Sequence, residues 1–180
     1  MPIIITVSGQ ARHGKNSFCD ILQIKLNELN KKSLIINYAD YLKYLAKQYY
    51  GWNGQKDEAG RTLLQQLGTE KIRSKKPDFW VDTVINFINV VKDDFDFILI
   101  GDCRFSNEIN KWLEKGYKTI SIHVTRTNFD NGLTLEQKNH ASEIALNGYE
   151  FDYYIGAENL EELEKEVDKF ILELKEEGTL

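Results

Sequence analysis

The feature that most constrains the fold is an apolar run followed directly by a glycine-bounded loop and then a helical pattern. Residues 3–7 read IIITV, and the loop over residues 8–17 reads SGQARHGKNS. Gly9 and Gly14 let the backbone fold back, so that consecutive N–H groups face a bound anion. The start of the helix and the ammonium of Lys15 add positive charge at the same point. Strand, loop and helix together favour a nucleoside triphosphate site.

The loop departs from the commonest form of this motif, in which Ser or Thr follows the lysine and its hydroxyl binds Mg²⁺. Asn16 stands at that position, and the hydroxyl comes one residue later with Ser17. Several small-molecule kinases have Gly-Lys-x-Ser/Thr, so the shift is typical of a subfamily. The alternative is a glycine-rich turn that binds nothing. The shift leaves the Mg²⁺ contact open at this point, and we expect the triphosphate at Gly9, Arg12, Gly14, Lys15, Asn16 and Ser17.

Composition predicts a soluble globular protein. A length of 180 residues, 42% of them hydrophobic and 28% charged, suits one domain with a full-sized core. The net charge of −5 argues against a nucleic-acid polymer or an anionic membrane as partner. No apolar stretch approaches the ~20 residues of a membrane span, and no signal peptide precedes the first strand. Cys19 and Cys103 provide no disulfide framework, so we expect a cytoplasmic protein in which both pack as small hydrophobes.

Apolar runs alternate with helical patterns along the whole chain, which predicts a single α/β domain with a mainly parallel sheet. The expected strands are 3–7, 33–38, 95–100, 119–124 and 151–155. The expected helices are 17–30, 39–50, 61–74, 77–92, 107–115 and 160–175. A polar stretch with little periodicity at 127–139 is long enough for a functional loop or lid.

Charged side chains follow several predicted strands. Asp102 ends the most apolar strand after the first, where a carboxylate holds Mg²⁺ in phosphate-loop enzymes; a turn or helix cap is the alternative. Arg104 offers a planar guanidinium to a transferred phosphoryl group. Arg126 follows the fourth strand, where it can stack on a base or reach a phosphate. Since ligands bind at the carboxyl ends of parallel strands, we expect Asp40, Asp102 and Arg126 to converge with the loop at 9–17 at one edge of the sheet.

Other polar residues give weaker signals when taken singly. Asp40 and Lys43 begin a predicted helix, and Arg61 and Gln65 lie on one helix face. A single arginine on a helix is more typical of a solvated surface than of a binding site. The cluster at 140–143 is typical of a capped helix N-terminus. Metal-ligand spacing is absent from the three histidines, so no zinc site is predicted at His13, His123 or His140.

In combination, these motifs resemble the deoxynucleoside monophosphate kinases of bacteriophages and some bacteria. The loop at 9–17 looks like that family's variant phosphate loop, and YADYLK at 38–43 is similar to its substrate-side motif. Residues 61–81, with Arg-x-Leu-Leu-Gln at their start and Pro-Asp-x-Trp-Val at their end, resemble its most distinctive central block. DCRFSNE at 102–108 and HASE at 140–143 look like its last two motifs. The resemblance covers nearly the whole chain in the same order.

The resemblance implies ATP- and Mg²⁺-dependent phosphorylation of a deoxynucleoside 5′-monophosphate to the diphosphate. It also implies the three-layer fold of the P-loop nucleoside monophosphate kinases within one domain, residues 1–180, around a central parallel five-stranded sheet. Residues of about 39–80 would form a substrate-binding helical part, and about 127–139 a short lid. By position, the catalytic residues would be Lys15, Asp102 and Arg104. The acceptor would contact Asp40, Lys43, Arg61, Gln65, Arg73 and Arg104.

Two further assignments come from the same resemblance. Arg126 would contact ATP, and Asp102 would share Mg²⁺ with Ser17. Relatives often have a second acid before Asp102, where this chain has Gly101. The metal role therefore falls to Asp102 alone on the strand side.

Other functions stay open at this point. A kinase for dephospho-coenzyme A or phosphomevalonate would share the scaffold and the Gly-Lys-x-Ser/Thr loop. A nucleotide-binding switch usually has an Asn-Lys-x-Asp motif, which this chain lacks. An inactive nucleotide-binding protein is a third alternative, because of Asn16 and Gly101. The base, the sugar preference and the oligomeric state are also open, with a homodimer as the commonest assembly of soluble enzymes.

Overall fold

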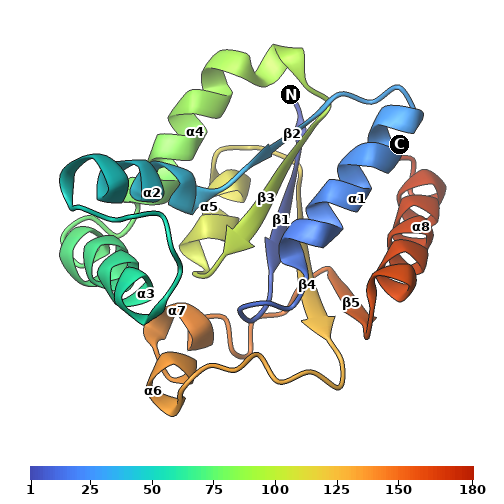
Figure 1. Ribbon diagram of the computed structural model, residues 1–180. Helices are drawn as coiled ribbons and strands as arrows, with labels where there is room; N and C mark the ends of the chain where they lie inside the picture. Colours follow the sequence, from blue (N-terminus) through green and yellow to red (C-terminus); the bar gives the residue numbers. More distant parts are fainter.

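A computed structural model describes residues 1–180 as a parallel β-sheet between two layers of helices (Figure 1). All five strands pair in parallel, in the order β2-β3-β1-β4-β5, which confirms the expected sheet. The central strands β1 and β3 are mostly apolar and buried along nearly their whole length because helices cover both sheet faces. The strands are β1 Ile3–Ser8, β2 Ser33–Ile36, β3 Phe97–Cys103, β4 Thr119–Arg126 and β5 Tyr153–Ala157.

Ten helical segments connect and follow the strands. No helix is long and apolar enough to cross a bilayer. The α-helices are α1 Lys15–Glu28, α2 Tyr38–Tyr49, α3 Glu58–Gln65, α4 Phe79–Val91, α5 Asn107–Glu114, α6 Leu135–Lys138, α7 Ala141–Ile144 and α8 Leu160–Glu176. A π-helix, η1 Gln66–Arg73, continues α3, and a short 3₁₀ turn, η2 Lys92–Asp94, follows α4.

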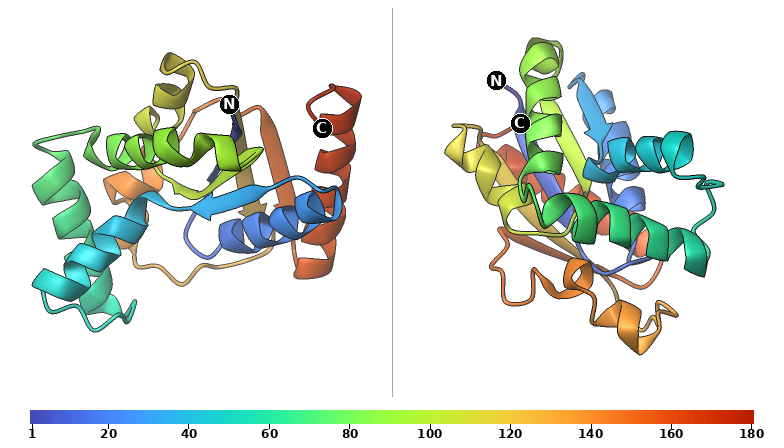
Figure 2. Two further views of the ribbon diagram at one scale, coloured as in Figure 1. Left: turned by 90° about the horizontal axis from the view of Figure 1, so that it is seen from above. Right: turned by 90° about the vertical axis from the view of Figure 1, so that its left-hand side faces the viewer.

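Two hydrophobic cores lie on the two faces of the sheet. Neighbouring residues of a strand point to opposite faces, so Ile4 belongs to one core and Ile5 to the other. Helices α1 and α8 close the Ile5 side, where Phe18 packs against Phe170. Helices α2, α4 and α5 close the Ile4 side, which also buries Trp112. Figure 2 shows α1 and α8 on one side of the sheet and α4 and α5 on the other.

Several boundaries differ from the sequence prediction. Strand β3 runs on to Cys103, so Asp102 lies inside the strand rather than after it, and β4 likewise includes Arg126. Tyr38 starts α2 instead of ending β2. The stretch at 127–139 contains the short helix α6. As predicted, both cysteines are buried and free.

In place of the single helix predicted at 61–74, the structure has an α-helix followed by a π-helix. The α-helix begins at Glu58, and from Gln66 onward its turns widen into the π-helix η1. Within this widened stretch, the carbonyl oxygen of Gly68 accepts a hydrogen bond from Trp80 Nε1 at 3.0 Å. A Cβ at Gly68 would lie 2.7 Å from Leu42 Cδ2, so the glycine also allows close packing of η1 on α2.

Candidate functional site

A cavity of about 650 Å³ opens at the carboxyl ends of the central strands. The loop after β1, the starts of α1 and α2, the α3–η1 helix, the end of β3 and α7 form its walls (Figure 1). Most of the predicted site residues therefore meet in one place. Those that line the cavity are Arg12, Gly14, Lys15, Asn16, Ser17, Lys43, Arg61, Gln65, Arg73, Asp102 and Arg104.

The loop after β1 has the backbone geometry of an anion-binding turn. Gly9 has a φ of +142° and Gly14 a φ of +89°, both outside the range that other residues favour. A Cβ on Gly9 would lie 2.2 Å from the carbonyl oxygen of Val124, so only glycine fits against β4. Gly14 also caps α1, whose first N–H groups face the cavity.

Lys15 is buried and lies across the loop. Its ammonium donates hydrogen bonds to the carbonyl oxygens of Gly9, at 2.9 Å, and Gln10, at 2.8 Å. Burial, together with the nearby charge of Arg104, lowers the pKa of Lys15 to about 7. A cation so poorly solvated gains most from a bound anion, as a phosphate group would supply.

Asp102 links the end of β3 to the start of α2. Its two carboxylate oxygens accept hydrogen bonds from the backbone N–H groups of Tyr38 and Ala39, both at 2.9 Å. Burial raises the pKa of Asp102, and the two backbone N–H groups act in the opposite direction. The helix-cap role is thus realised in the structure. The carboxylate also lines the cavity together with Ser17, and each of its oxygens keeps a second lone pair.

Four cations surround the opposite end of the cavity. They are Lys43 of α2, Lys56 in the following loop, Arg61 of α3 and Arg73 at the end of η1. Burial and the charges of Lys43 and Arg61 lower the pKa of Lys56. Cations gathered in this way mark a site for an anion. Sequence reasoning missed Lys56, because a lysine in a polar turn is typical of the solvated surface.

Arg73 is held in place by a second residue that the sequence did not single out. Glu108 forms an ion pair with Arg73 and is only 2% exposed. Its other oxygen accepts from the backbone N–H groups of Arg104, at 2.7 Å, and Phe105, at 3.1 Å. The Arg73 guanidinium stacks 3.9 Å from the centre of the Phe105 ring. Burial raises the pKa of Glu108. The available signals were its place in the first turn of a predicted helix and in the motif at 102–108, neither of which assigned it a role.

Arg104 lines the same cavity, and its charge adds to burial in lowering the pKa of both Lys15 and Lys56. Its guanidinium donates from Nη1 to Glu143 Oε1 at 2.6 Å and to the backbone carbonyl of Ser142 at 3.4 Å. Both acceptors belong to α7. The predicted convergence at one sheet edge is confirmed for the phosphate loop and Asp102, which line the same cavity as Arg104, but not for Asp40 and Arg126, which do not line it.

Three predicted contacts lie elsewhere. Gly9 supports the loop from behind and is not part of the cavity wall. Asp40 caps α2 and forms an ion pair with Lys43 at 2.9 Å. Arg126 stacks on Phe129 at 4.3 Å and donates to the carbonyl of Glu158 at 3.1 Å. Arg126 is thus on the outer side of the loop, where its backbone N–H donates to His13 Nδ1 at 3.2 Å.

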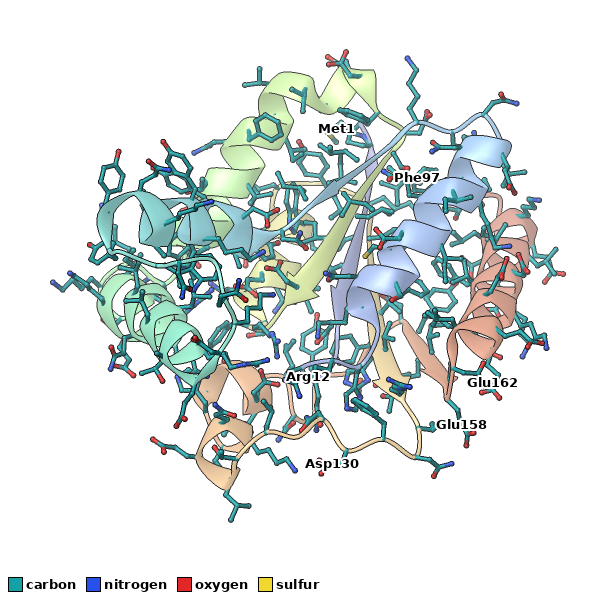
Figure 3. All side chains as sticks on the ribbon, in the orientation of Figure 1. Met1, Arg12, Phe97, Asp130, Glu158 and Glu162 are labelled. Atoms are coloured by element: carbon teal, nitrogen blue, oxygen red, sulfur yellow. The ribbon has the colours of Figure 1, made fainter.

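The segment at 127–139 packs against the loop. Arg12 donates from Nη1 to the carbonyl oxygen of Asn131 at 2.9 Å. The Asn131 side chain is buried and donates to Gln10 Oε1 at 3.3 Å. Figure 3 shows Arg12 on the loop directly beside the segment that contains Asp130.

Comparisons with known proteins agree with this geometry. The APS kinase CysC of Mycobacterium tuberculosis, in complex with AMPPNP and APS, matches at a TM-score of 0.57 and 11% identity, covering 97% of this chain and 98% of that chain. The shikimate kinase of Bacteroides thetaiotaomicron matches at 0.51 and 13% identity, covering 97% and 98%. At these identities the likeness concerns the fold alone. A search of curated protein sequences gave no match.

The sequence itself matches a family model described as deoxynucleotide monophosphate kinase over residues 28–167. That range begins after the phosphate loop, so the loop geometry and the family match are separate observations. The match confirms the resemblance found in the motifs. The protein is a phosphotransferase with the fold of the P-loop kinases, acts on small-molecule nucleotides, and belongs to the deoxynucleotide monophosphate kinase family.

Proposed function

We propose that this protein transfers the terminal phosphoryl group of Mg-ATP to a deoxynucleoside 5′-monophosphate. The observation that supports this most directly is one cavity with two cationic ends. The phosphate loop and Lys15 lie at one end, and Lys43, Lys56 and Arg61 at the other, and Arg104 is near enough to both groups to add to the burial that lowers the pKa of Lys15 and of Lys56. Two substrates that both end in phosphates suit such a cavity, and their reacting groups would meet at Arg104.

On the donor side, the loop N–H groups and Lys15 bind the ATP phosphates. Ser17 and Asp102 provide a hydroxyl and a carboxylate for Mg²⁺, which prefers oxygen ligands and keeps several waters. No cluster of three acidic, histidine or cysteine residues exists that could enclose a metal ion. The Ser17 hydroxyl and the Asp102 carboxylate therefore fit a Mg²⁺ ion that is bound mainly through the phosphates of ATP. Once bound, the ion neutralises charge on the transferred group. Arg126, beside the loop, serves ATP from outside the cavity.

On the acceptor side, Lys43, Lys56, Arg61 and Arg73 neutralise the monophosphate, and Gln65 offers an amide to the base or sugar. Leu42, Leu64 and Trp80 form an apolar wall that suits a planar base. No general base is needed, because an acceptor phosphate oxygen is already anionic. The cavity carboxylates fit this chemistry, since hydrogen bonds occupy Asp102, Glu108 and Glu143.

The proposal divides the single domain into functional parts. Residues of about 39–80 form the acceptor-binding helical part, and 127–139 form a lid that excludes water from the reacting phosphates. The buried, free cysteines support a cytoplasmic location. A homodimer is the assembly to test first, by light scattering.

A molecule that spans both ends tests the proposal directly. A dinucleoside pentaphosphate, with adenosine at one end and a deoxynucleoside at the other, joins donor and acceptor in one ligand. It should bind at least ~100-fold more tightly than ATP, because one ligand then engages both cationic ends. Equal affinities for the pentaphosphate and ATP would contradict a two-substrate cavity. Titration calorimetry gives both dissociation constants.

A further inference from the structure

The structure joins α7 to the phosphate loop through one buried carboxylate. Glu143 Oε1 accepts from Arg104 Nη1 at 2.6 Å, and Glu143 Oε2 accepts from the backbone N–H of Ala11 at 3.2 Å. Ala11 belongs to the phosphate loop, 132 residues away in sequence. The Glu143 side chain is 10% exposed and that of Arg104 is 25% exposed. The pair is therefore not a solvated surface contact.

A carboxylate at this place has an electrostatic cost. Glu143 lines the same cavity as Lys15 and Ser17, where phosphates bind under the proposed function. A buried negative charge beside bound phosphates weakens binding unless a cation offsets it. Arg104 is that cation, and the 2.6 Å contact is short enough for a strong, charge-assisted hydrogen bond. Glu143 is thus the charged partner that sets the direction of the Arg104 guanidinium, together with the longer contact to the Ser142 carbonyl.

The short helix α7 is built to present Glu143. It comprises only Ala141–Ile144, a length that is not stable by itself. His140 caps it: its Nδ1 accepts from the Ser142 backbone N–H at 3.2 Å and lies 2.8 Å from Ser142 Oγ. The Ser142 carbonyl then accepts from Arg104 at 3.4 Å. The cluster at 140–143 forms one local unit that faces Arg104.

On this basis we infer that Glu143 is a positioning residue for phosphoryl transfer, acting through Arg104. One oxygen orients the Arg104 guanidinium, and the other ties that orientation to the phosphate loop at Ala11. Arg104 is thereby held where the donor and acceptor phosphates meet. The inference rests on the proposed function, because it assigns Arg104 to the transferred phosphoryl group.

A double-mutant cycle tests this role. Glu143→Gln keeps the size of the side chain and an oxygen for Ala11 but removes the charge that orients Arg104. We expect kcat to fall ~10- to 100-fold, the scale for misplacing a group that stabilises the transition state, with both KM values changed less than ~3-fold. In the Arg104→Ala background the same substitution should change kcat less than ~2-fold, since nothing is left to orient.

Controls separate positioning from folding. Glu173→Gln, at an exposed position of α8 away from the cavity, should leave kcat and the melting temperature unchanged. Glu143→Asp keeps the charge on a shorter side chain and should recover part of the lost kcat. Losses that multiply in the double variant, or a Glu143→Gln kcat within twofold of wild type, would overturn the inference. The same holds if Glu143→Gln does not fold and Glu143→Asp multiplies with Arg104→Ala.

The cycle is also read on the slow hydrolysis of ATP, which needs no acceptor nucleotide because water takes the phosphoryl group. If the wild-type protein phosphorylates no deoxynucleoside monophosphate, the proposed function fails. The positioning role is then judged from the ATP hydrolysis rates of the four proteins. Non-additive losses of ~3-fold or more support it, and additive losses overturn it.

Discussion

At the scale of single residues, the acidic side chains of the cavity already have hydrogen-bond partners within the protein, whereas several of its cationic side chains have none that is negatively charged. The acids Asp102, Glu108 and Glu143 are all engaged by backbone N–H groups or arginines. Lys15 has only carbonyl partners, and Lys56 has like-charged neighbours that lower its pKa. This imbalance predicts anionic ligands and specific effects of removing single cations.

Lys15 makes ATP binding dependent on pH. Its pKa of about 7 lies well below that of a solvated lysine, so at pH 8 the side chain is mostly neutral in the free protein. Bound phosphates favour the charged form. We therefore expect ATP binding at pH 8 to take up most of one proton and to weaken as pH rises above 7. Calorimetry in two buffers of different ionisation enthalpy measures the uptake.

The same shift has an effect on stability. A lysine whose folded pKa is lowered binds fewer protons in the folded than in the unfolded state between pH 7 and its solvated value, so its contribution to stability rises with pH across that window. Lys15→Gln is the control for both effects, since it has no ammonium to titrate. Equal proton uptake by wild type and Lys15→Gln would assign the uptake to another group.

The acceptor-side cations should act on one substrate only. We expect Arg61→Ala and Lys56→Ala each to raise the KM of the acceptor ~10-fold or more, the scale for losing a hydrogen bond to a charged group, with the KM of ATP unchanged. Lys47→Ala is the matched control, because Lys47 is exposed on α2 and does not line the cavity. Steady-state kinetics with each substrate varied gives these constants. An effect confined to the KM of ATP would move the residue to the donor side.

At the scale of elements, the π-helix η1 places the acceptor side of the site. It carries Arg73 at its last residue, and its close contact with α2 depends on Gly68. The sequence pattern predicted one regular helix over residues 61–74. The widened turns depend on Trp80 and Leu42, which lie outside the segment, so local propensity could not reveal them.

Gly68→Ala tests this arrangement. The added methyl would overlap Leu42, so we expect a loss of about 1–3 kcal/mol in the free energy of unfolding, together with a higher acceptor KM. Denaturant titration measures the loss. Leu42→Ala should relieve the overlap, so the double variant should be more stable than the sum of the two single losses predicts. Purely additive losses would show that overlap with Leu42 does not cause the loss in the free energy of unfolding.

At the scale of the whole molecule, the alternation of strands and helices along the chain predicted the location of the site better than any single motif did. Parallel strands end at one edge, so the phosphate loop and Asp102 could be brought together before any contact was known, whereas Asp40 and Arg126, predicted at the same edge, do not line the cavity. Side chains that act through tertiary partners could not be placed in this way. Glu108 is recognisable only from its contacts with Arg73 and the Arg104 turn, and Arg126 depends on where Phe129 lies.

The central claim is the transfer of phosphoryl from ATP to a deoxynucleoside monophosphate. The most direct measurement is ADP release from Mg-ATP with each common deoxynucleoside and ribonucleoside monophosphate. Dephospho-coenzyme A and phosphomevalonate belong in the same series, and Lys15→Ala, expected to lose at least ~10²-fold in kcat, is the negative control. We predict ADP release that depends on one or more deoxynucleoside monophosphates. Release with none of them, while ATP still binds, would contradict the claim.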